Sequence, residues 1–190
     1  LAHGVTVHLT REPGGTPVAE AIRAILLEDH DEMIDPKTEA LLMSASRAQH
    51  IARVIEPSLT NEHWVLCDRF FDASLAYQGG GRGLSMPDMQ QLQNWVVGTN
   101  VPDLTILLDA PVSVCLSRIE NRTHRDRIEQ ETHDFFEQVR QTYLALAQAQ
   151  PERIHIIDAS QSFEAVAQDT KALIHRHFVD HLGMLARDSA

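Results

Sequence analysis

Four short apolar segments rich in β-branched residues most constrain the fold of this chain. They cover residues 5–10, 64–67, 104–108 and 154–157. Each is nearly continuous in hydrophobicity rather than alternating, which is typical of parallel strands covered on both faces. Helical patterns separate the segments, so the sequence predicts a doubly wound α/β fold in a single domain spanning residues 1–190.

Capping signals place the helices between these strands. Thr16 followed by Pro17 predicts a helix that runs to about residue 29. Asp35 followed by Pro36 predicts a second helix, which reaches residue 55 and is stopped by Pro57. Further helices are expected over residues 85–97, 111–121, 132–148 and 162–181.

Charged residues follow every predicted strand. They are Arg11-Glu12, Asp68-Arg69, Asp109 and Asp158. Ligands of open parallel sheets bind outside the carboxyl ends of the strands. Any one of these endings could be a solvated strand end, but the four together predict a binding rim of arginines and carboxylates.

The overall charge limits the class of partner. A net charge of −11 over 190 residues argues against a nucleic-acid polymer, because phosphate backbones are bound by basic faces. Of the 16 lysines and arginines only Lys37 and Lys171 are lysines. Arginine suits bidentate capture of phosphate. Biased codon usage would give the same excess of arginine, so the places of the arginines in the fold have to decide between these two explanations.

Neither a membrane nor an oxidising compartment is indicated. No apolar run approaches the roughly 20 residues of a membrane-spanning helix. Cys67 and Cys115 have neither a disulfide framework nor a metal-binding spacing, so we expect both thiols to be reduced. These features predict a cytoplasmic protein.

The segment after residue 67 carries the groups best suited to a nucleotide. Arg69 could fork onto a phosphate while Asp68 holds the water shell of Mg²⁺, or the two could form an internal ion pair. Tyr77 and Gln78 offer a ring and an amide for a sugar and a base edge. The glycines at 79–83 could cradle a phosphate, but no helix start follows directly, so we expect a flexible loop.

A second concentration of arginines lies within ten residues of one another. It contains Arg118, Arg122, Arg125 and Arg127. They could form a salt-bridged helix end, which spacing alone slightly favours, or a mobile flap over a transferring phosphoryl group.

Five motifs occur together in one order. They are T-R-E-P-G-G-T (10–16), S-R-A-Q-H (46–50), D-R-F-F-D-A-S-L-A-Y-Q-G-G-G-R-G (68–83), P-D-L-T-I-L-L-D (102–109) and D-R-I-E-Q-E (126–131). In this order and spacing the chain closely resembles bacterial thymidylate kinase from about residue 5 to residue 170.

The resemblance implies a three-layer fold of the P-loop NTPase type, with helices on both faces of a five-stranded parallel sheet. It implies transfer of the γ-phosphoryl group of MgATP to dTMP, which gives dTDP for dTTP synthesis. It also implies a cytoplasmic homodimer that binds neither nucleic-acid polymers nor membranes.

Site residues follow from the matched motifs. The resemblance implies catalytic roles for Asp68, Arg69 and Arg127, with Mg²⁺ held by Asp68 indirectly through a bound water. The implied dTMP site consists of Arg11, Glu12, Arg47, Arg69, Ser74, Tyr77 and Gln78, in which Arg47 reaches the thymine carbonyl. The implied ATP and lid residues are Arg118, Arg122, Arg125, Arg127, Asp158, Ser160 and Gln161, with the lid at about 118–131.

Two features depart from the family pattern. Met43 and Ser44 stand where an aromatic ring usually stacks on thymine, so Phe70 or Phe71 is the expected substitute. No G-x-x-x-x-G-K-[ST] loop is present, and Leu1–Gly4 resembles the end of the helix that should follow it. We therefore expect this chain to be part of an intact kinase. The alternatives are a truncated, non-catalytic nucleotide-binding chain and a related nucleoside monophosphate kinase.

Overall fold

A computed structural model of the chain describes residues 5–120 and 126–185. The described strands are β1 (Val7–Arg11), β2 (Trp64–Asp68), β3 (Thr105–Asp109) and β4 (Ile154–Asp158). The α-helices are α1 (Pro17–Leu27), α2 (Pro36–His50), α3 (Glu56–Thr60), α4 (Phe71–Ser74), α5 (Met86–Val97), α6 (Val112–Glu120), α7 (His133–Ala149) and α8 (Phe163–Leu185). Two π-helical segments, η1 (Ile51–Ile55) and η2 (Leu75–Gly81), complete the order. The predicted alternation of strands and helices is confirmed.

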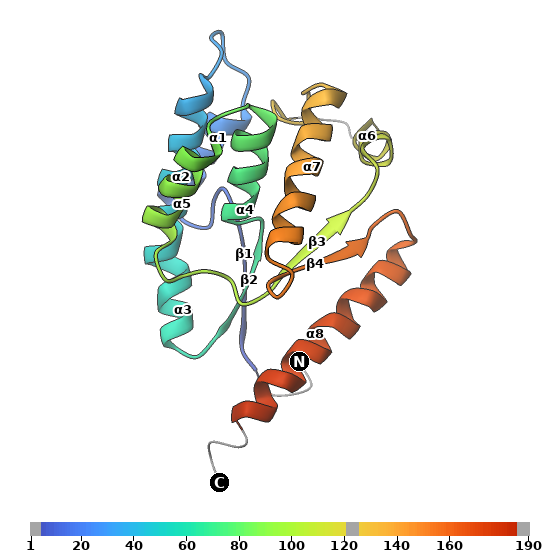
Figure 1. Cartoon of the computed structure of the whole chain (residues 1–190). Helices are drawn as coiled ribbons and strands as arrows, with labels where there is room; N and C mark the ends of the chain where they lie inside the picture. The colour runs from blue at the N-terminus through green and yellow to red at the C-terminus, as the bar shows by residue number, and fades with distance from the viewer. Residues whose placement is uncertain (1–4, 121–125, 186–190) are drawn as a thin grey trace.

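The four strands form two parallel pairs, β1 with β2 and β3 with β4 (Figure 1). Helix α3 packs against β2, α7 against β3 and β4, and α8 against β4. One aliphatic side chain on each strand stays more than half exposed, namely Leu9, Leu66, Leu108 and Ile156. The two core clusters of the described part lie among the helices: one joins α2, α4, η2 and α5, and the other joins η2 and α7.

Three helices begin at a residue whose side chain caps the first turn, and two of these caps, Thr16 and Asp35, are predicted from the sequence. The Oγ1 of Thr16 accepts the backbone N–H of Ala19, and the Oγ1 of Thr132 accepts that of Phe135. At α2 the carboxylate of Asp35 accepts the N–H of Lys37. Each cap satisfies a backbone donor that the first turn would otherwise leave without a partner.

Pro57 does not stop the second helix as the sequence predicts. The chain continues from α2 through η1 into α3, and Pro57 lies in the first turn of α3. The N–H of Glu56 bonds to the carbonyl of Ile51, an i to i−5 bond that widens the turn before the proline. The wider turn leaves space for the proline ring. It also removes the need for the backbone N–H that proline lacks, so the helix continues to Thr60.

The glycine run at 79–83 is not the flexible loop that the sequence predicts. Gly79, Gly80 and Gly81 complete η2, which packs against α7. A Cβ on Gly80 would lie 2.9 Å from the Cβ of Thr142, and one on Gly81 would lie 2.5 Å from the ring of Phe135. The glycines are thus needed for close helix packing.

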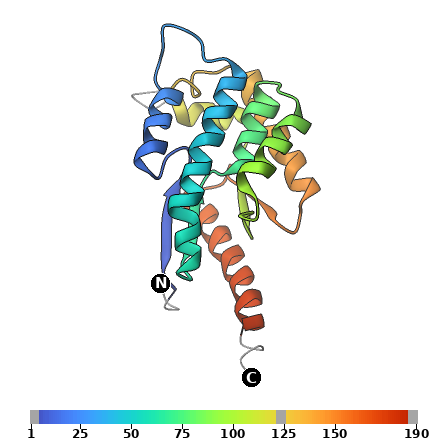
Figure 2. The same ribbon diagram turned by 90° about the vertical axis from the view of Figure 1, so that its left-hand side faces the viewer.

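The two views show which segments extend from the body of the molecule. The connection between α1 and α2 projects at the top, and α8 extends beyond the strands at the opposite end (Figures 1 and 2). Among the helices of residues 5–120 and 126–185, none combines the length and the apolar character needed to cross a bilayer.

Candidate active site

The carboxyl ends of the paired strands set charged residues side by side. Arg11 is in register with Asp68, and Asp109 is in register with Asp158. In each pair the backbone pairing continues one residue beyond the carboxyl end of the strands. Glu12 N–H donates to Asp68 O at 2.9 Å, and Ala159 N–H donates to Asp109 O at 2.6 Å. Charged residues therefore lie at the carboxyl end of both strand pairs, as the sequence predicts; their role in binding stays a prediction.

The turn after β1 is fixed by contacts on both sides. Gly15 has a φ of 86°, and a Cβ there would lie 2.6 Å from the ring of His50. Its N–H donates to Glu20 at 2.9 Å, while Arg23 donates to the carbonyl of Pro13 at 2.8 Å. Only glycine combines this backbone conformation with so close an approach, so the T-R-E-P-G-G-T turn has one defined shape.

A buried ionic network lies beneath this turn. The carboxylate of Glu12 accepts Arg47 Nε at 2.7 Å and contacts His50 Nδ1 at 2.9 Å. His50 Nε2 also lies 2.7 Å from Thr10 Oγ1, so the imidazole joins the strand to the turn. The side chains of Glu12, Arg47 and His50 are almost completely buried. Removing one partner of such a pair typically costs about 3–5 kcal/mol, because it leaves the other charge uncompensated.

Arg47 makes its other contacts with neighbouring helices. Its Nη1 donates to Ser74 Oγ at 3.0 Å and to Gln93 Oε1 at 2.6 Å. The guanidinium also lies over the ring of Phe70, 5.4 Å from the centroid. With only 2% of its side chain exposed, Arg47 lies beneath the surface here and packs under the half-buried ring of Phe70. Phe71, by contrast, is a core residue at 6% exposure.

Arg69 is an exposed arginine of this region, like Arg11. It follows β2 directly and adopts a φ of 66°, which only a minority of non-glycine residues adopt. Its guanidinium lies 5.1 Å from the centroid of the Tyr77 ring, and that ring packs edge-on against Phe135 and Tyr143. An aromatic platform thus orients the guanidinium of Arg69 at the carboxyl end of β2, beside the exposed Asp68.

Four of the residues predicted for ATP, namely Arg118, Asp158, Ser160 and Gln161, meet at a second place, the end of β4. Arg118 Nη2 donates to the carbonyl of Ala159 at 2.9 Å, which joins the end of α6 to the loop after β4. In that loop Asp158 accepts both the N–H and the hydroxyl of Ser160, and these hydrogen bonds lower the pKa of the Asp158 carboxyl. Gln161 donates to the carbonyl of Asp158 at 3.0 Å.

Three predicted residues lie apart from their expected groups. Arg127 does not meet Arg118; its Nη2 donates to the buried Glu39 at 2.6 Å. Arg11 pairs with Glu20 at 2.9 Å on the surface. Gln78 turns its amide to Glu39 rather than toward Arg47. Arg122 and Arg125 lie outside the described residues.

Sequence reasoning missed two buried residues, His50 in the network beneath the turn and Glu39, which binds Gln78, Arg82 and Arg127. Both lie on α2, whose buried positions also include Ser44, Ser46 and Arg47. The available signal was the pattern itself, because charged and hydroxyl residues at helical spacing occupy the face that an ordinary helix fills with aliphatic side chains.

Cys67 is not set up as a nucleophile. Burial, followed by the nearby charge of Glu12, raises the pKa of Cys67 to about 12. The thiol therefore stays protonated near neutral pH and donates to the carbonyl of Arg69. Cys115 is exposed on α6.

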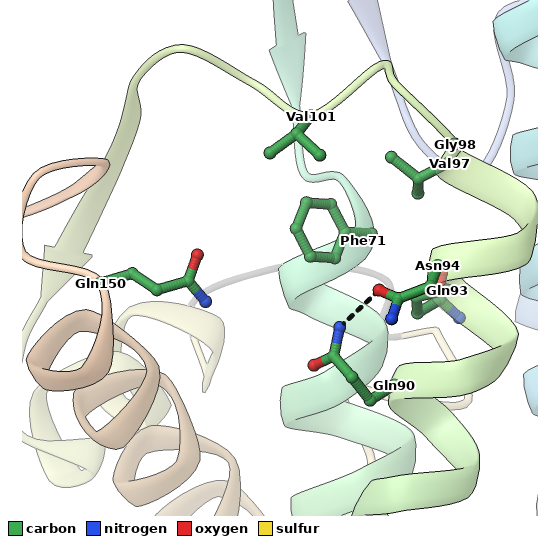
Figure 3. A pocket seen from close by; sticks show the side chains of 8 residues that line it. All are labelled: Phe71, Gln90, Gln93, Asn94, Val97, Gly98, Val101 and Gln150. Atoms are coloured by element: carbon green, nitrogen blue, oxygen red, sulfur yellow. Dashed lines mark hydrogen bonds between the residues drawn. The ribbon is translucent and has the colours of Figure 1, made fainter.

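A small cavity of about 170 Å³ lies near the amino ends of β3 and β4, at the other end of these strands from the charged residues. Figure 3 shows amide side chains around the ring of Phe71, and Gln90 donates to Asn94 at 2.8 Å. Val101 precedes β3 and Gln150 precedes β4, so the cavity lies near the amino ends of these strands. It is separate from the rim of charged residues.

Comparison with known proteins gives a consistent family. The family described as thymidylate kinase matches residues 1–170. Thymidylate kinase of Pseudomonas putida strain GB-1 is 54% identical over 172 residues, covering 90% of this chain and 82% of the relative. That of Vesicomyosocius okutanii is 49% identical over 170 residues, covering 90% and 83%. The crystal structure of thymidylate kinase from Ehrlichia chaffeensis superimposes with a TM-score of 0.69 at 30% identity, covering 88% of this chain and 80% of that one.

Proposed function

Because the chain belongs to the thymidylate kinase family, we propose that it transfers the γ-phosphoryl group of ATP to dTMP at the carboxyl ends of β1 and β2. The observation that supports this most is the exposed residue Arg69, whose guanidinium lies over the Tyr77 ring beside Asp68. An oriented, exposed arginine is the group that binds a phosphate bidentately.

The chemistry of the acceptor explains why no activated nucleophile is needed. The attacking atom is a phosphate oxygen whose second pKa is about 6, so it is already ionised near neutral pH. Catalysis then consists of in-line positioning and neutralisation of charge. In this proposal Arg69 binds the dTMP phosphate, and Tyr77 lies against the deoxyribose.

In this proposal the residues around Arg47 position the thymine base of dTMP. Since the Arg47 guanidinium is occupied by Glu12, Ser74 and Gln93, we assign it a supporting role for the ring of Phe70. That ring is half-buried and becomes the proposed stacking partner of thymine. Direct contact of Arg47 with the thymine carbonyl, as the resemblance implies, requires an exchange of these hydrogen bonds.

The donor side is proposed at the end of β4. Arg118 and the loop from Asp158 to Gln161 would lie beside ATP, with Arg127 and the segment at 118–131 as the lid. Mg²⁺ would be bound with ATP, and the exposed Asp68 carboxylate offers the hard oxygen that suits its water shell. When bound, the ion neutralises charge on the phosphate oxygens. Both substrates are intracellular metabolites, so we place the reaction in the cytoplasm.

A coupled ADP-release assay with dTMP, dUMP, dCMP and thymidine tests the function. In the intact enzyme we expect turnover with dTMP well above that with the other three. Turnover of another monophosphate at equal rate would point to a related kinase instead. Saturable dTMP binding without any turnover would point to a non-catalytic nucleotide-binding protein.

A single substitution tests the assigned site. In the intact enzyme, Arg69→Ala should lower kcat/KM for dTMP roughly 100-fold or more, as does loss of one charged group that stabilises a transition state. Arg176→Ala removes an exposed arginine on α8 and serves as the matched control. Calorimetry should show weakened dTMP binding and nearly unchanged ATP binding; equal loss for both ligands would refute the role.

We also propose a homodimer that uses the outer face of α2. Leu41, Ala45, Ala48 and Ala52 are exposed at helical spacing along α2 and η1. The neighbouring helix α5 exposes 83% of Trp95. An apolar stripe of this kind marks an association surface. Sedimentation velocity should show a dimer that Ala48→Glu converts to monomers, and an unchanged dimer in the variant would exclude this face.

A further inference from the structure

Glu39 is a buried carboxylate at which three separate segments meet. Its side chain is 1% exposed, and its two oxygens accept hydrogen bonds from Gln78, Arg82 and Arg127. The distances are 2.8 Å from Gln78 Nε2, 3.1 and 3.2 Å from Arg82, and 2.6 Å from Arg127 Nη2. We call Glu39 with these three partners the Glu39 cluster.

One side of the cluster belongs to the proposed acceptor site. Gln78 lies on η2, one residue after Tyr77, and the guanidinium of Arg69 lies over the Tyr77 ring. Arg82 follows directly after η2, and its guanidinium lies 4.8 Å from the centroid of the Phe135 ring. A movement of η2 on binding dTMP would therefore move both donors relative to the Glu39 carboxylate.

The other side of the cluster belongs to the segment before α7. Arg127 donates through Nε to the carbonyl of Leu26 at 2.9 Å, and its backbone N–H donates to Leu27 at 3.2 Å. Arg82 also pairs with Glu131 at 2.5 Å. The described part of this segment is thus bound to the end of α1 and to α2 through a few charged hydrogen bonds.

The charges of the cluster make the two sides depend on one another. Arg82 and Arg127 share the single Glu39 carboxylate, and Glu131 supplies the second negative charge. In a buried site each of these hydrogen bonds is strengthened by the low local dielectric. Changing the position of one donor therefore changes how strongly the carboxylate holds the others.

We propose that Glu39 is a positioning residue that couples occupancy of the acceptor site on η2 to the position of Arg127 and of the segment at 126–131. This inference rests on the proposed function, since it takes dTMP as the acceptor. Glu39 itself touches no reacting atom in this proposal; it acts through Gln78 and Arg127.

Amide hydrogen exchange tests the coupling without requiring turnover. In the wild type, saturating dTMP should slow exchange in η2 and also, roughly fivefold or more, in residues 126–131, which is the low end of coupling between sites. In Glu39→Gln the slowing in η2 should remain while that in 126–131 disappears. The matched control is Glu152→Gln, which makes the same change at an exposed carboxylate outside the Glu39 cluster and outside residues 126–131, and it should behave as the wild type.

The outcomes separate the coupling from the function. Undiminished slowing in 126–131 of Glu39→Gln, or slowing confined to η2 in the wild type, would overturn the coupling while leaving the acceptor site intact. If dTMP slows neither segment in the wild type, the proposed acceptor site fails and the inference falls with it. Should Glu39→Gln fail to fold, Arg127→Leu leaves Glu39 paired with Arg82 and should abolish the same transmission; retained transmission there would refute the proposal.

Discussion

At the scale of single residues, Glu39 shows how burial and hydrogen bonding compete over one carboxyl group. Burial alone raises its pKa, but hydrogen bonds from Arg82, Gln78 and Arg127 outweigh that effect and lower the pKa below its ordinary value of 4.5. The ionised form is therefore favoured in the folded protein, even though only 1% of the side chain is exposed.

The lowered pKa of Glu39 predicts how stability changes with pH. A carboxyl group whose pKa is lowered on folding contributes stability above its unfolded pKa, and this contribution is lost as pH falls through the folded pKa. Urea unfolding should therefore show that the advantage of wild type over Glu39→Gln shrinks as pH falls below about 4.5. Glu152→Gln, at an exposed position, provides the control, and a difference that stays constant with pH would contradict the prediction.

Single residues also mark the limit of what sequence could predict. Arg69 and Tyr77 are close in sequence to β2, and the order of motifs was enough to select them. His50 and Glu39 were missed because their partners lie 38 to 88 residues away, at Glu12 and Arg127. No local pattern predicts which distant group compensates a buried charge; only the packing of α2 against the turn and η2 does.

At the scale of elements, the strands and capped helices were predictable, whereas the π-helical segments were not. The predicted strands agree with the observed ones to within two residues at every end. Local apolar runs and capping residues specify these elements. In η1 and η2, however, the turn widens to fit Pro57 and the glycine run, and a wider turn has no distinct periodicity over so few residues.

The glycine run yields a prediction for η2. Gly80→Ala should destabilise the protein by about 1–3 kcal/mol, because its Cβ meets Thr142 and lies 3.1 Å from the backbone carbonyl of Gln138, which cannot move away. Gly79→Ala meets only the flexible end of Met86, at 2.9 Å, and should cost clearly less. Thermal unfolding of both variants checks this order, and equal losses would show that packing on α7 does not explain the run.

At the scale of the whole molecule, one ion pair connects the two strand pairs. Arg153, just before β4, donates to both carboxylate oxygens of Asp72 on α4, each at 2.7 Å. It also donates to Thr105 at the start of β3 and lies 5.0 Å from the centroid of the Phe71 ring. The pair is buried and joins the part of the chain after β2 to the β3–β4 pair.

Breaking this pair should weaken the whole domain. Asp72→Asn is expected to lower the free energy of unfolding by about 3–5 kcal/mol, since it leaves a buried guanidinium without its counter-charge. Glu20→Gln breaks the exposed pair with Arg11, at 41% and 48% side-chain exposure, and should cost at most about 1 kcal/mol. Urea denaturation measures both, and a cost for Asp72→Asn as small as that of the surface pair would show that the two halves are held together by other contacts.

The left-handed backbone conformation of Arg69 has a consequence for which substitutions evolution would select at this position. A φ of 66° suits glycine, and a residue with a side chain there carries a cost of order 1–3 kcal/mol. Selection for heat resistance alone should therefore replace Arg69 by glycine, giving a sturdier protein that no longer captures the acceptor phosphate. Selection for growth that depends on the enzyme should keep the arginine, so the two regimes should diverge at this position.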